Sequence, residues 1–381
     1  MTLYQWMNEI QQHFPNLKKW QAVGLALFSY GVVIARRCQT SVVAEELPRQ
    51  GKADTIQRRL QRWLSNPRIQ VKVCCQWWVR WVWSRYDAAR PNLLVDETKL
   101  GARIGVMMIS LAFEQRAIPL LWCCYIANSA KDYPVEGQVK LIERLLGTIL
   151  PCFPGGCRPL LQADRGIGNS SNLIRAMQQL GVTFLFRVKK NSRFTIASGK
   201  SHGLADLVKP GEQGSGRGVL FTEEHRVRVI AHVIWEIGQK EPWCLVTNDP
   251  TIRGAFYAAR MWQEESFRDL KSGGWQWQCT QIDDPRRAER LILVLAVAYA
   301  WMLTLGTFVL HADKATQLEV TKGNDGKYSV FRLGLRYMKR MLAVNPAQIY
   351  VGLFFAPHQR ICQKVSSPQP APGEKGWDGG G

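Results

Sequence analysis

Acidic side chains are scarce in this sequence of 381 residues, which has 30 Asp and Glu against 50 Lys and Arg. The resulting formal net charge of +20 indicates a polyanionic partner, either a nucleic acid or an anionic membrane surface. The chain also lacks the composition of a disordered protein, since 46% of its residues are hydrophobic and 21% are charged. We therefore expect a globular protein, and the length predicts two or three domains.

Cysteine is too rare and too dispersed to indicate a disulfide framework. The 10 cysteines lie mostly in apolar runs, as Cys74 and Cys75 do, and this is typical of buried thiols. Cys152 and Cys157 are close in sequence, but no second cysteine or histidine pair stands at zinc-finger spacing. We expect free thiols, no zinc site and a reducing compartment.

A secretory signal is also missing, and only one segment resembles a membrane span. Residues 1–15 contain Glu9 and no unbroken apolar stretch, so we expect no signal peptide. Residues 291–310 carry no charge and are long enough to cross a bilayer. Their Ala, Thr and Gly content, and the mixed charges before them, favour a helix buried in a large core. We therefore expect no membrane association.

Residues 1–90 have the most one-sided charge, with 14 Lys and Arg against 5 Asp and Glu. Their apolar residues recur at helical spacing, and Asp54 predicts the cap of one helix. On that helix Arg58, Arg59 and Arg62 lie outside the apolar stripe. They form either an ordinary solvated face or a set of contacts to DNA phosphates. We interpret this part as a helical DNA-binding domain.

The chain that follows alternates between strand and helix patterns. Short apolar runs bounded by polar residues or glycine predict strands, and apolar residues at helical spacing predict helices. In chain order these are strands at 93–95, 104–113 and 118–126, a helix at 135–150, a strand at 159–162, a helix from Asn169 and a strand at 183–188. This order outlines an α/β fold in which a mixed sheet is flanked by helices.

Three later segments complete the organisation. Residues 189–245 combine Gly- and Ser-rich turns with alternating strands, which we interpret as a β-rich insertion. Residues 254–271 return to a helical pattern. We assign residues 311–365 to a C-terminal helical region that contacts a second subunit or DNA. Residues 366–381 are rich in Pro and Gly and are predicted to be a disordered tail.

Two of the few acidic residues follow apolar runs that are predicted to be strands. Asp96 comes directly after residues 93–95, and Asp164 follows residues 160–163. A carboxylate at the end of one strand can meet another from a neighbouring strand. Such carboxylates repel one another unless a hard cation such as Mg²⁺ or Mn²⁺ lies between them. Each aspartate is by itself most simply a turn residue, so these two alone do not establish a site.

A third acidic residue belongs to a spaced pattern of four functional side chains. Tyr257, Arg260, Glu264 and Lys271 stand at intervals that place them along one stripe of a helix. The pattern Tyr-x2-Arg-x3-Glu-x6-Lys resembles the signature of the DDE transposases of the insertion-sequence-four family, which are bacterial cut-and-paste enzymes.

The two aspartates strengthen this resemblance because both lie in segments similar to the aspartate motifs of the family. The first is Val-Asp-Glu-Thr at residues 95–98, and the second is Asp-Arg-Gly at residues 164–166. The resemblance covers about residues 90–310. It implies a ribonuclease H-like catalytic domain made of residues 91–188 and 246–310, which the β-rich insertion interrupts.

The resemblance also implies roles for the acids. Asp96, Asp164 and Glu264 are expected to be catalytic and to hold two Mg²⁺ ions per active site, which Mn²⁺ can replace. Glu97 and Glu265, which are next to Asp96 and Glu264 in the sequence, are not expected to belong to this group. Alternation along a strand turns Glu97 away from Asp96, and the helical turn points Glu265 away from Glu264.

Tyr257, Arg260 and Lys271 are assigned by the resemblance to the binding of transposon ends, where Arg and Lys contact DNA phosphates. For the two basic residues the alternative is a surface ion pair with Glu264 or Asp269.

Arg165, in the second aspartate motif, is a further expected DNA contact. Related enzymes hold a flipped base with a tryptophan, and the insertion offers Trp235 and Trp243. Trp275 and Trp277 are further candidates, and each of these tryptophans is also explained as a core residue.

The sequence therefore predicts a transposase that binds the terminal inverted repeats of an insertion sequence as double-stranded DNA. It is expected to cleave the strands at the ends through hairpin intermediates and to join the 3′ ends to target DNA. Synapsis of two ends implies a homodimer, and the expected location is the bacterial cytoplasm, at the nucleoid. The alternative is a DNA-binding protein derived from a transposase that no longer transposes, against which the intact acidic triad argues. A membrane-associated protein is a third possibility.

Overall fold

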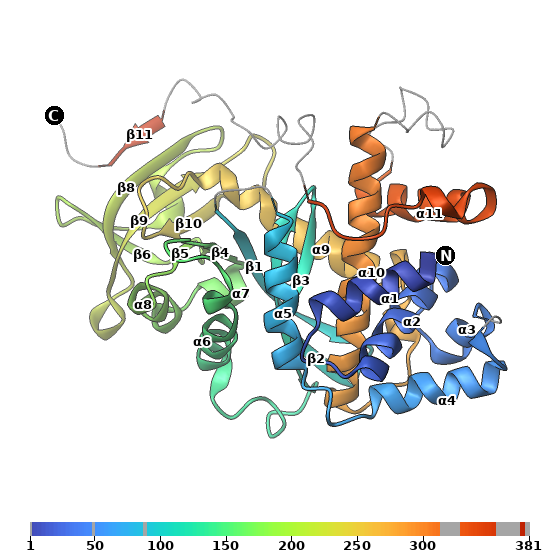
Figure 1. The fold of residues 1–381 in the computed structure, drawn as a ribbon. Helices are drawn as coiled ribbons and strands as arrows, with labels where there is room; N and C mark the ends of the chain where they lie inside the picture. The colour runs from blue at the N-terminus through green and yellow to red at the C-terminus, as the bar shows by residue number, and fades with distance from the viewer. Residues whose placement is uncertain (1, 48–49, 87–89, 313–327, 356–373, 378–381) are drawn as a thin grey trace.

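The computed structural model describes residues 2–47, 50–86, 90–312, 328–355 and 374–377. One large mixed sheet, flanked by helices, forms the centre of the molecule, and the N-terminal helices lie together around the long helix α10 at one end (Figure 1). This is the α/β architecture that the sequence predicts, and it is consistent with a ribonuclease H-like domain. Every cysteine in the described ranges is free.

The elements alternate along the chain in the predicted order. The helices are α1 (Thr2–His13), α2 (Lys19–Ala35), α3 (Thr40–Glu45), α4 (Ala53–Leu64), α5 (Val71–Ser84), α6 (Gly137–Ile149), α7 (Arg165–Gly168), α8 (Ser171–Gln179), α9 (Met261–Arg268), α10 (Pro285–His311) and α11 (Val330–Val344). The strands are β1 (Asn92–Leu100), β2 (Ile104–Phe113), β3 (Arg116–Ile126), β4 (Leu160–Ala163), β5 (Thr183–Arg187), β6 (Arg193–Ile196), β7 (Ser201–Gly203), β8 (Gln213–Leu220), β9 (Val227–Ile234), β10 (Trp243–Thr247) and β11 (Glu374–Gly376).

The N-terminal helices share a hydrophobic core with α10. Trp6 of α1 stacks on Trp301 of α10 with ring centroids 4.2 Å apart. Arg290 of α10 is buried, and its guanidinium donates to the backbone oxygens of Leu64 and Ile69 at 2.9 and 3.3 Å. These contacts hold the segment between α4 and α5 against the start of α10.

Helix α4 presents the three predicted arginines to solvent, since Arg58, Arg59 and Arg62 are all exposed. The prediction that Asp54 caps this helix is wrong. Lys52 occupies the cap position without a side-chain hydrogen bond, and Asp54 lies in the first turn. An acidic side chain in the first turn is still favourable there because it faces the positive end of the helix dipole.

The strand order of the sheet is β3-β2-β1-β4-β5-β10-β9-β8-β6-β7. β1 and β4 are parallel, as are β4 and β5, whereas β2 and β3 form antiparallel pairs at one edge. The prediction that the first strand ends before Asp96 is wrong, because β1 continues to Leu100. The second half of β1 is kept extended by pairing with β2, from Asp96 opposite Met108 to Leu100 opposite Ile104.

The strands of residues 189–245 extend this sheet. β10 pairs with β5 on one side and with β9 on the other, so that β9, β8, β6 and β7 follow in order. The expected end of the insertion, between residues 245 and 246, thus falls within β10. In the segment predicted to be a disordered tail, β11 is ordered by parallel pairing with β8. Residues 366–373 and 378–381 of that segment lie outside the described residues.

Helix α10 contains the uncharged segment. It is long and apolar enough to cross a membrane, but 94% of its most apolar window is buried inside the molecule, as in a core helix. α11, from the region 311–365, crosses it at two glycines. A Cβ at Gly334 would lie 1.9 Å from the backbone oxygen of Met302, and one at Gly306 would lie 1.9 Å from that of Val330. The two helices therefore touch backbone to backbone.

Candidate active site

Two of the predicted acids lie at the same level of neighbouring strands. The last paired residues of the parallel strands β1 and β4 are Val95 and Ala163. Asp96 and Asp164 follow directly, Asp96 inside β1 and Asp164 just after β4. Asp164 is also the N-cap of α7, where its Oδ1 accepts a hydrogen bond from the backbone N–H of Ile167 at 3.0 Å. This bond fixes the carboxylate at the end of β4.

The Tyr-Arg-Glu-Lys pattern spans three short helical pieces. Tyr257 and Arg260 lie in a 3-10 turn, Glu264 lies in the first turn of α9, and Lys271 lies in a π-helical turn after it. The expected helix over residues 254–271 is therefore helical up to Lys271, but it is a regular α-helix only in α9. Lys271 has φ −87° and ψ −125°, so the backbone leaves the helix at this residue.

The three acids converge on the guanidinium of Arg260. Its Nη2 atom lies 2.9 Å from Oδ2 of Asp96 and 3.9 Å from Oδ2 of Asp164, and its Nη1 atom lies 3.7 Å from Oε1 of Glu264. The Arg260 side chain is only 4% exposed, whereas those of Asp164 and Glu264 are 43% and 54% exposed. Arg260 is therefore a buried cation surrounded by carboxylates, which differs from a surface ion pair.

The comparison with known families agrees with this geometry. Residues 99–301 match the family described as the transposase DDE domain, and this is more than half of the chain. The chain belongs to this family. Transposases of this kind act on DNA and use divalent metal ions. The match includes Asp164 and Glu264 and begins three residues after Asp96. No curated protein matches the chain.

Beside the acids, the DDE transposase has a cavity of about 340 Å³. Tyr257, Arg260 and Glu264 all line it, because the 3-10 turn continues directly into α9 and the two together present these side chains to one space. The other lining residues are Asp164, Arg165, Gly166, Arg187, Trp243 and Met261.

Asp96 is the most buried of the three acids, with a side chain that is 13% exposed. Burial raises its pKa to about 6, although the charge of Arg260 and a hydrogen bond from the backbone N–H of Glu97 favour the carboxylate. Glu97 itself is exposed, and it accepts a hydrogen bond from the hydroxyl of Tyr125 on β3.

Lys271 is outside the residues that line the cavity but close to Asp96. Its Nζ donates to Oγ1 of Thr98 at 2.7 Å, and Thr98 lies two residues beyond Asp96 on the same face of β1. Burial lowers the pKa of Lys271, and the charge of Asp96 opposes this effect. Lys271 is thus held beside β1, the strand of Asp96, and not by the suggested ion pair with Asp269.

The tryptophans separate clearly in space. Trp243 lines the cavity, and its ring meets that of Tyr257 edge to face, with centroids 5.4 Å apart. Trp235 is not among the lining residues and donates from Nε1 to the backbone oxygen of Gln239. Trp275 and Trp277 are fully buried in the core.

Sequence reasoning missed two residues next to the cavity, Arg187 and Glu241. Arg187 ends β5 and lines the cavity, and Glu241 accepts from both Arg187 and Arg165 at 2.9 Å. The available signal was the position of Arg187, a charged residue directly after the four buried residues of β5. Glu241 gave none, because it comes from a loop before β10.

The acids have the right chemistry for a hard cation, since carboxylate oxygens are the ligands that Mg²⁺ prefers. All three lie within 3.9 Å of a single guanidinium, so one ion could be reached by all of them. As they stand, however, no three His, Cys, Asp or Glu side chains in the described ranges are close enough to hold an ion. The three carboxylates are spaced to surround the guanidinium of Arg260, which is larger than a metal ion.

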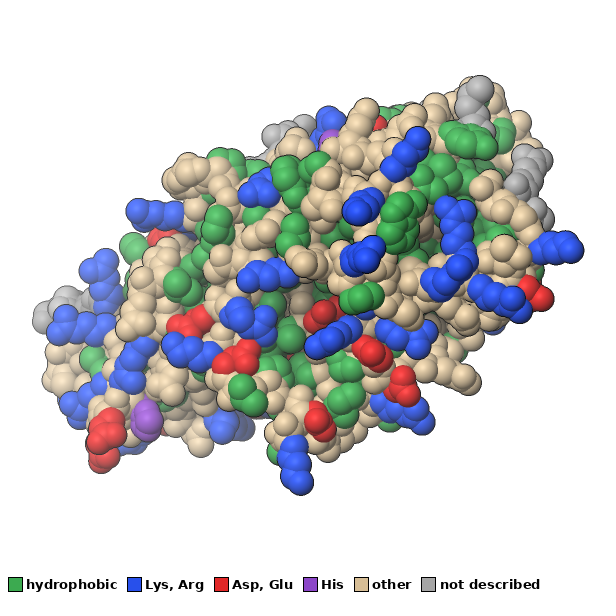
Figure 2. All heavy atoms as spheres, turned by 60° about the horizontal axis from the view of Figure 1, so that its bottom comes forward, with side chains coloured by type: hydrophobic (Ala, Val, Ile, Leu, Met, Phe, Trp, Pro, Cys, Tyr) green, Lys and Arg blue, Asp and Glu red, His purple; other side chains and the backbone are tan. Residues whose placement is uncertain are grey.

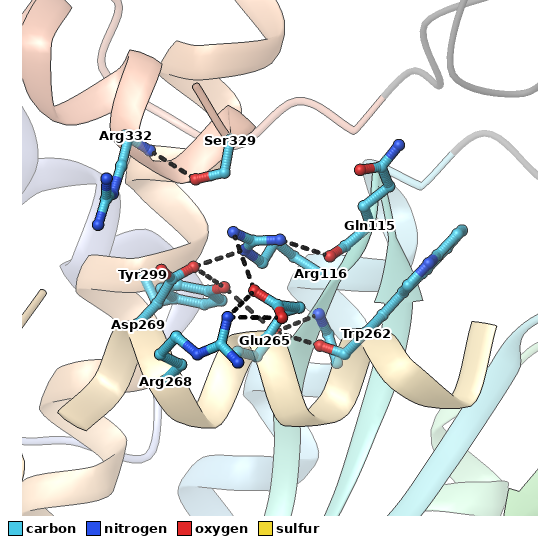
Figure 3. A network of polar contacts seen from close by, with 11 residues as sticks. Gln115, Arg116, Trp262, Glu265, Arg268, Asp269, Tyr299, Ser329 and Arg332 are labelled. Atoms are coloured by element: carbon cyan, nitrogen blue, oxygen red, sulfur yellow. Dashed lines mark hydrogen bonds and ion pairs between the residues drawn. The ribbon is translucent and has the colours of Figure 1, made fainter. Parts of the chain in front are cut away.

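On its other side, α9 is fixed by a buried polar network (Figure 3). Nε of Arg116, at the start of β3, lies 2.5 Å from Oδ2 of Asp269, and the hydroxyl of Tyr299 donates to the same oxygen at 3.1 Å. Ser266 Oγ accepts from the backbone N–H of Ala117 at 2.6 Å. The network ties α9 to β3 and α10 while Glu264 faces the acids.

The surface of the DDE transposase carries many more basic than acidic side chains, and Figure 2 shows Lys and Arg spread over one whole face. On the N-terminal helices a cavity of about 470 Å³ is lined by Trp20, Gly24, Arg59, Arg62, Trp63, Asn66 and Arg68. Trp20 is 51% exposed there. Within the described residues, none of these three arginines forms an ion pair with an acid.

Proposed function

We propose that this DDE transposase cleaves DNA strands at the ends of an insertion sequence and joins the 3′ ends to target DNA. Asp96, Asp164 and Glu264 are the proposed catalytic residues. The observation that carries the proposal is the convergence of these three acids, from β1, β4 and α9, around one buried guanidinium. The Tyr-Arg-Glu-Lys spacing supports placing the enzyme in the insertion-sequence-four family.

The three carboxylates would hold the metal. Two Mg²⁺ ions bound there, or Mn²⁺ in their place, would supply the positive charge that activates the attacking oxygen and stabilises the leaving oxygen of the phosphodiester. The cap bond from Ile167 to Asp164 keeps that carboxylate in place, and the network behind α9 does the same for Glu264.

The cavity beside the acids would receive the DNA terminus. Arg165 and Arg260 would contact its phosphates, and Lys271 would do so from the side of Thr98. The edge-to-face pair of Tyr257 and Trp243 offers an aromatic wall for a base or sugar. Of the two tryptophans in residues 189–245, we therefore favour Trp243 over Trp235 as the residue that holds a flipped base.

The remaining assignments rest on the charge of the chain and on the need for two DNA ends. Residues 1–90, with exposed Arg58, Arg59 and Arg62, would bind the terminal inverted repeats. Two transposon ends require two subunits, so we propose a homodimer in the synaptic complex, with residues 311–365 at the subunit or DNA contact. Cleavage of the second strand through a hairpin, and a place at the nucleoid in the bacterial cytoplasm, complete the proposal.

The test is a strand-cleavage assay on a labelled DNA fragment that carries the ends of the element. With Mg²⁺ the purified protein should produce nicks, hairpins and joined products on a denaturing gel, and Glu264→Ala should produce none. Glu265→Ala is the matched control and should retain cleavage, because Glu265 is next to Glu264 on α9 but half-buried on another side, where it pairs with Arg268 at 2.8 Å. If the wild type binds end DNA but makes no nick even with Mn²⁺, the chain is instead a DNA-binding protein that no longer transposes.

A further inference from the structure

Arg260 lies where its charge and its volume compete with those of a metal ion. Its terminal nitrogens are 2.9, 3.9 and 3.7 Å from oxygens of Asp96, Asp164 and Glu264. Mg²⁺ in a carboxylate site needs its oxygen ligands at about 2.0–2.1 Å. The carboxylates cannot close to that distance around an ion while a guanidinium fills the space between them. This explains why the described acids converge without forming a group that could hold a metal.

The hydrogen bonding of Arg260 is incomplete. The Nε and Nη1 atoms are buried and have no hydrogen-bond partner among the described residues. A buried donor without a partner costs about 1–3 kcal/mol, and more when the group is charged. The short contact of Arg260 is the one from Nη2 to Oδ2 of Asp96. Arg260 is therefore held mainly by electrostatic attraction to the three carboxylates, and not all of its N–H groups form hydrogen bonds. Such a side chain can be displaced by a stronger competitor for the same acids.

We propose that Arg260 is a positioning residue that keeps the three carboxylates gathered and yields its place between them to the metal ions. This rests on the proposed function of the triad. Without a cation at this point the three acids would repel one another. The neighbouring Arg165 cannot replace Arg260 in this role because it is paired with Glu241 at 2.9 Å.

When metal ions displace it, the guanidinium can move into the cavity on the open side of the site. Asp164 and Glu264 are 43% and 54% exposed, and the cavity that they line with Arg260 is where a DNA phosphate would enter. A phosphate accepts two parallel hydrogen bonds from a guanidinium, which matches the fork of Arg260. Binding of the phosphate and binding of the metal therefore favour the same movement. By linkage, each should tighten the other.

The experiment measures Mn²⁺ binding by the full chain in the absence of DNA, from the electron paramagnetic resonance signal of the free ion. Arg260→Gln should bind Mn²⁺ at least about fivefold more tightly than the wild type, the lower end of typical coupling between sites. Arg144→Gln, on α6 and outside this cavity, is the control and should bind Mn²⁺ as the wild type does, because Arg144 is paired with Glu136 at 2.9 Å. End DNA should tighten Mn²⁺ binding to the wild type but not to Arg260→Gln.

Equal or weaker Mn²⁺ binding by Arg260→Gln overturns the proposal and leaves the proposed function standing, provided that Asp96→Asn still abolishes Mn²⁺ binding. If Asp96→Asn has no effect on Mn²⁺ binding, the proposed function fails as well. Should Arg260→Gln not fold, Arg260→Lys provides the same test because its single ammonium cannot contact three carboxylates as the fork does. Mn²⁺ should then raise the melting temperature of that variant more than it raises that of the wild type.

Discussion

At the scale of single residues, the site combines one basic and three acidic side chains that differ in their exposure to solvent. Arg260 and Asp96 are nearly buried, whereas Asp164 and Glu264 reach solvent. Burial makes the first pair sensitive to its surroundings, as the pKa of Asp96 shows. The exposed pair leaves the site open toward the cavity. The inner residues therefore set the electrostatics of the site, and the outer ones line the cavity.

The raised pKa of Asp96 predicts a pH dependence of metal binding. Because protons and metal compete for this carboxylate, Mn²⁺ affinity should fall about tenfold per pH unit below about pH 6, where Asp96 becomes protonated. The folded protein holds this proton more tightly than the unfolded chain does. The contribution of Asp96 to the free energy of unfolding should therefore decrease as the pH rises from about 4 to about 6. Calorimetric Mn²⁺ titrations between pH 5 and pH 8 measure the first effect, and a flat profile would contradict it.

At the scale of elements, α9 is the part that brings the third acid to the other two. One side of the helix faces the cavity with Glu264, and the other is bound to β3 and α10 through the network of Figure 3. The carboxylate of Asp269 is 5% exposed, and burial raises its pKa against the effect of Arg116. The position of α9 thus depends on an ion pair that is largely buried.

Breaking this pair on one side should be costly. Arg116→Met or Asp269→Leu alone should lower the free energy of unfolding by about 3–5 kcal/mol, because the first leaves the buried carboxylate of Asp269 without its ion pair and the second leaves Arg116 with only the 3.9 Å contact to Glu265. The double variant should recover most of this loss in urea unfolding, since two apolar side chains of similar volume replace the pair. Single variants that cost less than about 1 kcal/mol would show that water reaches the pair.

The close crossing of α10 and α11 leads to a second prediction, which concerns the stability of the protein. Gly334→Ala should destabilise the protein by about 2–3 kcal/mol, because the new methyl group would collide with the backbone of α10. Gly147→Ala on α6 is the control, since nothing lies within 4 Å of the added atom. It should be neutral or stabilise by about 0.5–1 kcal/mol through helix propensity. Equal melting temperatures for the two variants would contradict this account of the crossing.

At the scale of the whole molecule, the excess of positive charge is spread over two functional regions. Among the residues that the structure describes, the arginines exposed on α4 have no acidic partner, and the cavity beside the three acids is lined by further basic residues. The helices are not separate from the sheet, because Trp6 and Trp301 stack across α1 and α10. DNA held by α4 would thus be bound to the same rigid core that carries the site.

This distribution predicts a salt-dependent contribution from α4. The double variant Arg59→Ala/Arg62→Ala should weaken binding of any duplex and reduce the slope of log affinity against log salt by about 2, one for each phosphate that an arginine no longer neutralises. Arg144→Ala is the control because Arg144 is paired with Glu136 at 2.9 Å. Fluorescence anisotropy at several salt concentrations gives both slopes, and identical slopes would show that α4 does not contact DNA.

The sequence predicted the class of fold and the acids because these depend on local patterns. Apolar runs indicated the strands, and the spacing of Tyr257, Arg260 and Glu264 was visible in one segment. What it missed depends on pairing between distant segments. β1 continues past Asp96 only because β2 pairs with it, and Glu241 meets Arg187 only after β10 joins β5. Likewise, only the folded structure shows that Trp243 lines the cavity and Trp235 does not.

Asp96, Asp164 and Glu264 are proposed to act together as the catalytic centre. The most direct measurement is the single-turnover rate of Mg²⁺-dependent cleavage of end DNA by the alanine variant of each acid, with melting temperatures to confirm folding. All three variants should show no detectable cleavage, while Glu97→Ala and Glu265→Ala retain rates near that of the wild type. A folded triad variant that cleaves as fast as its neighbouring control would contradict the account.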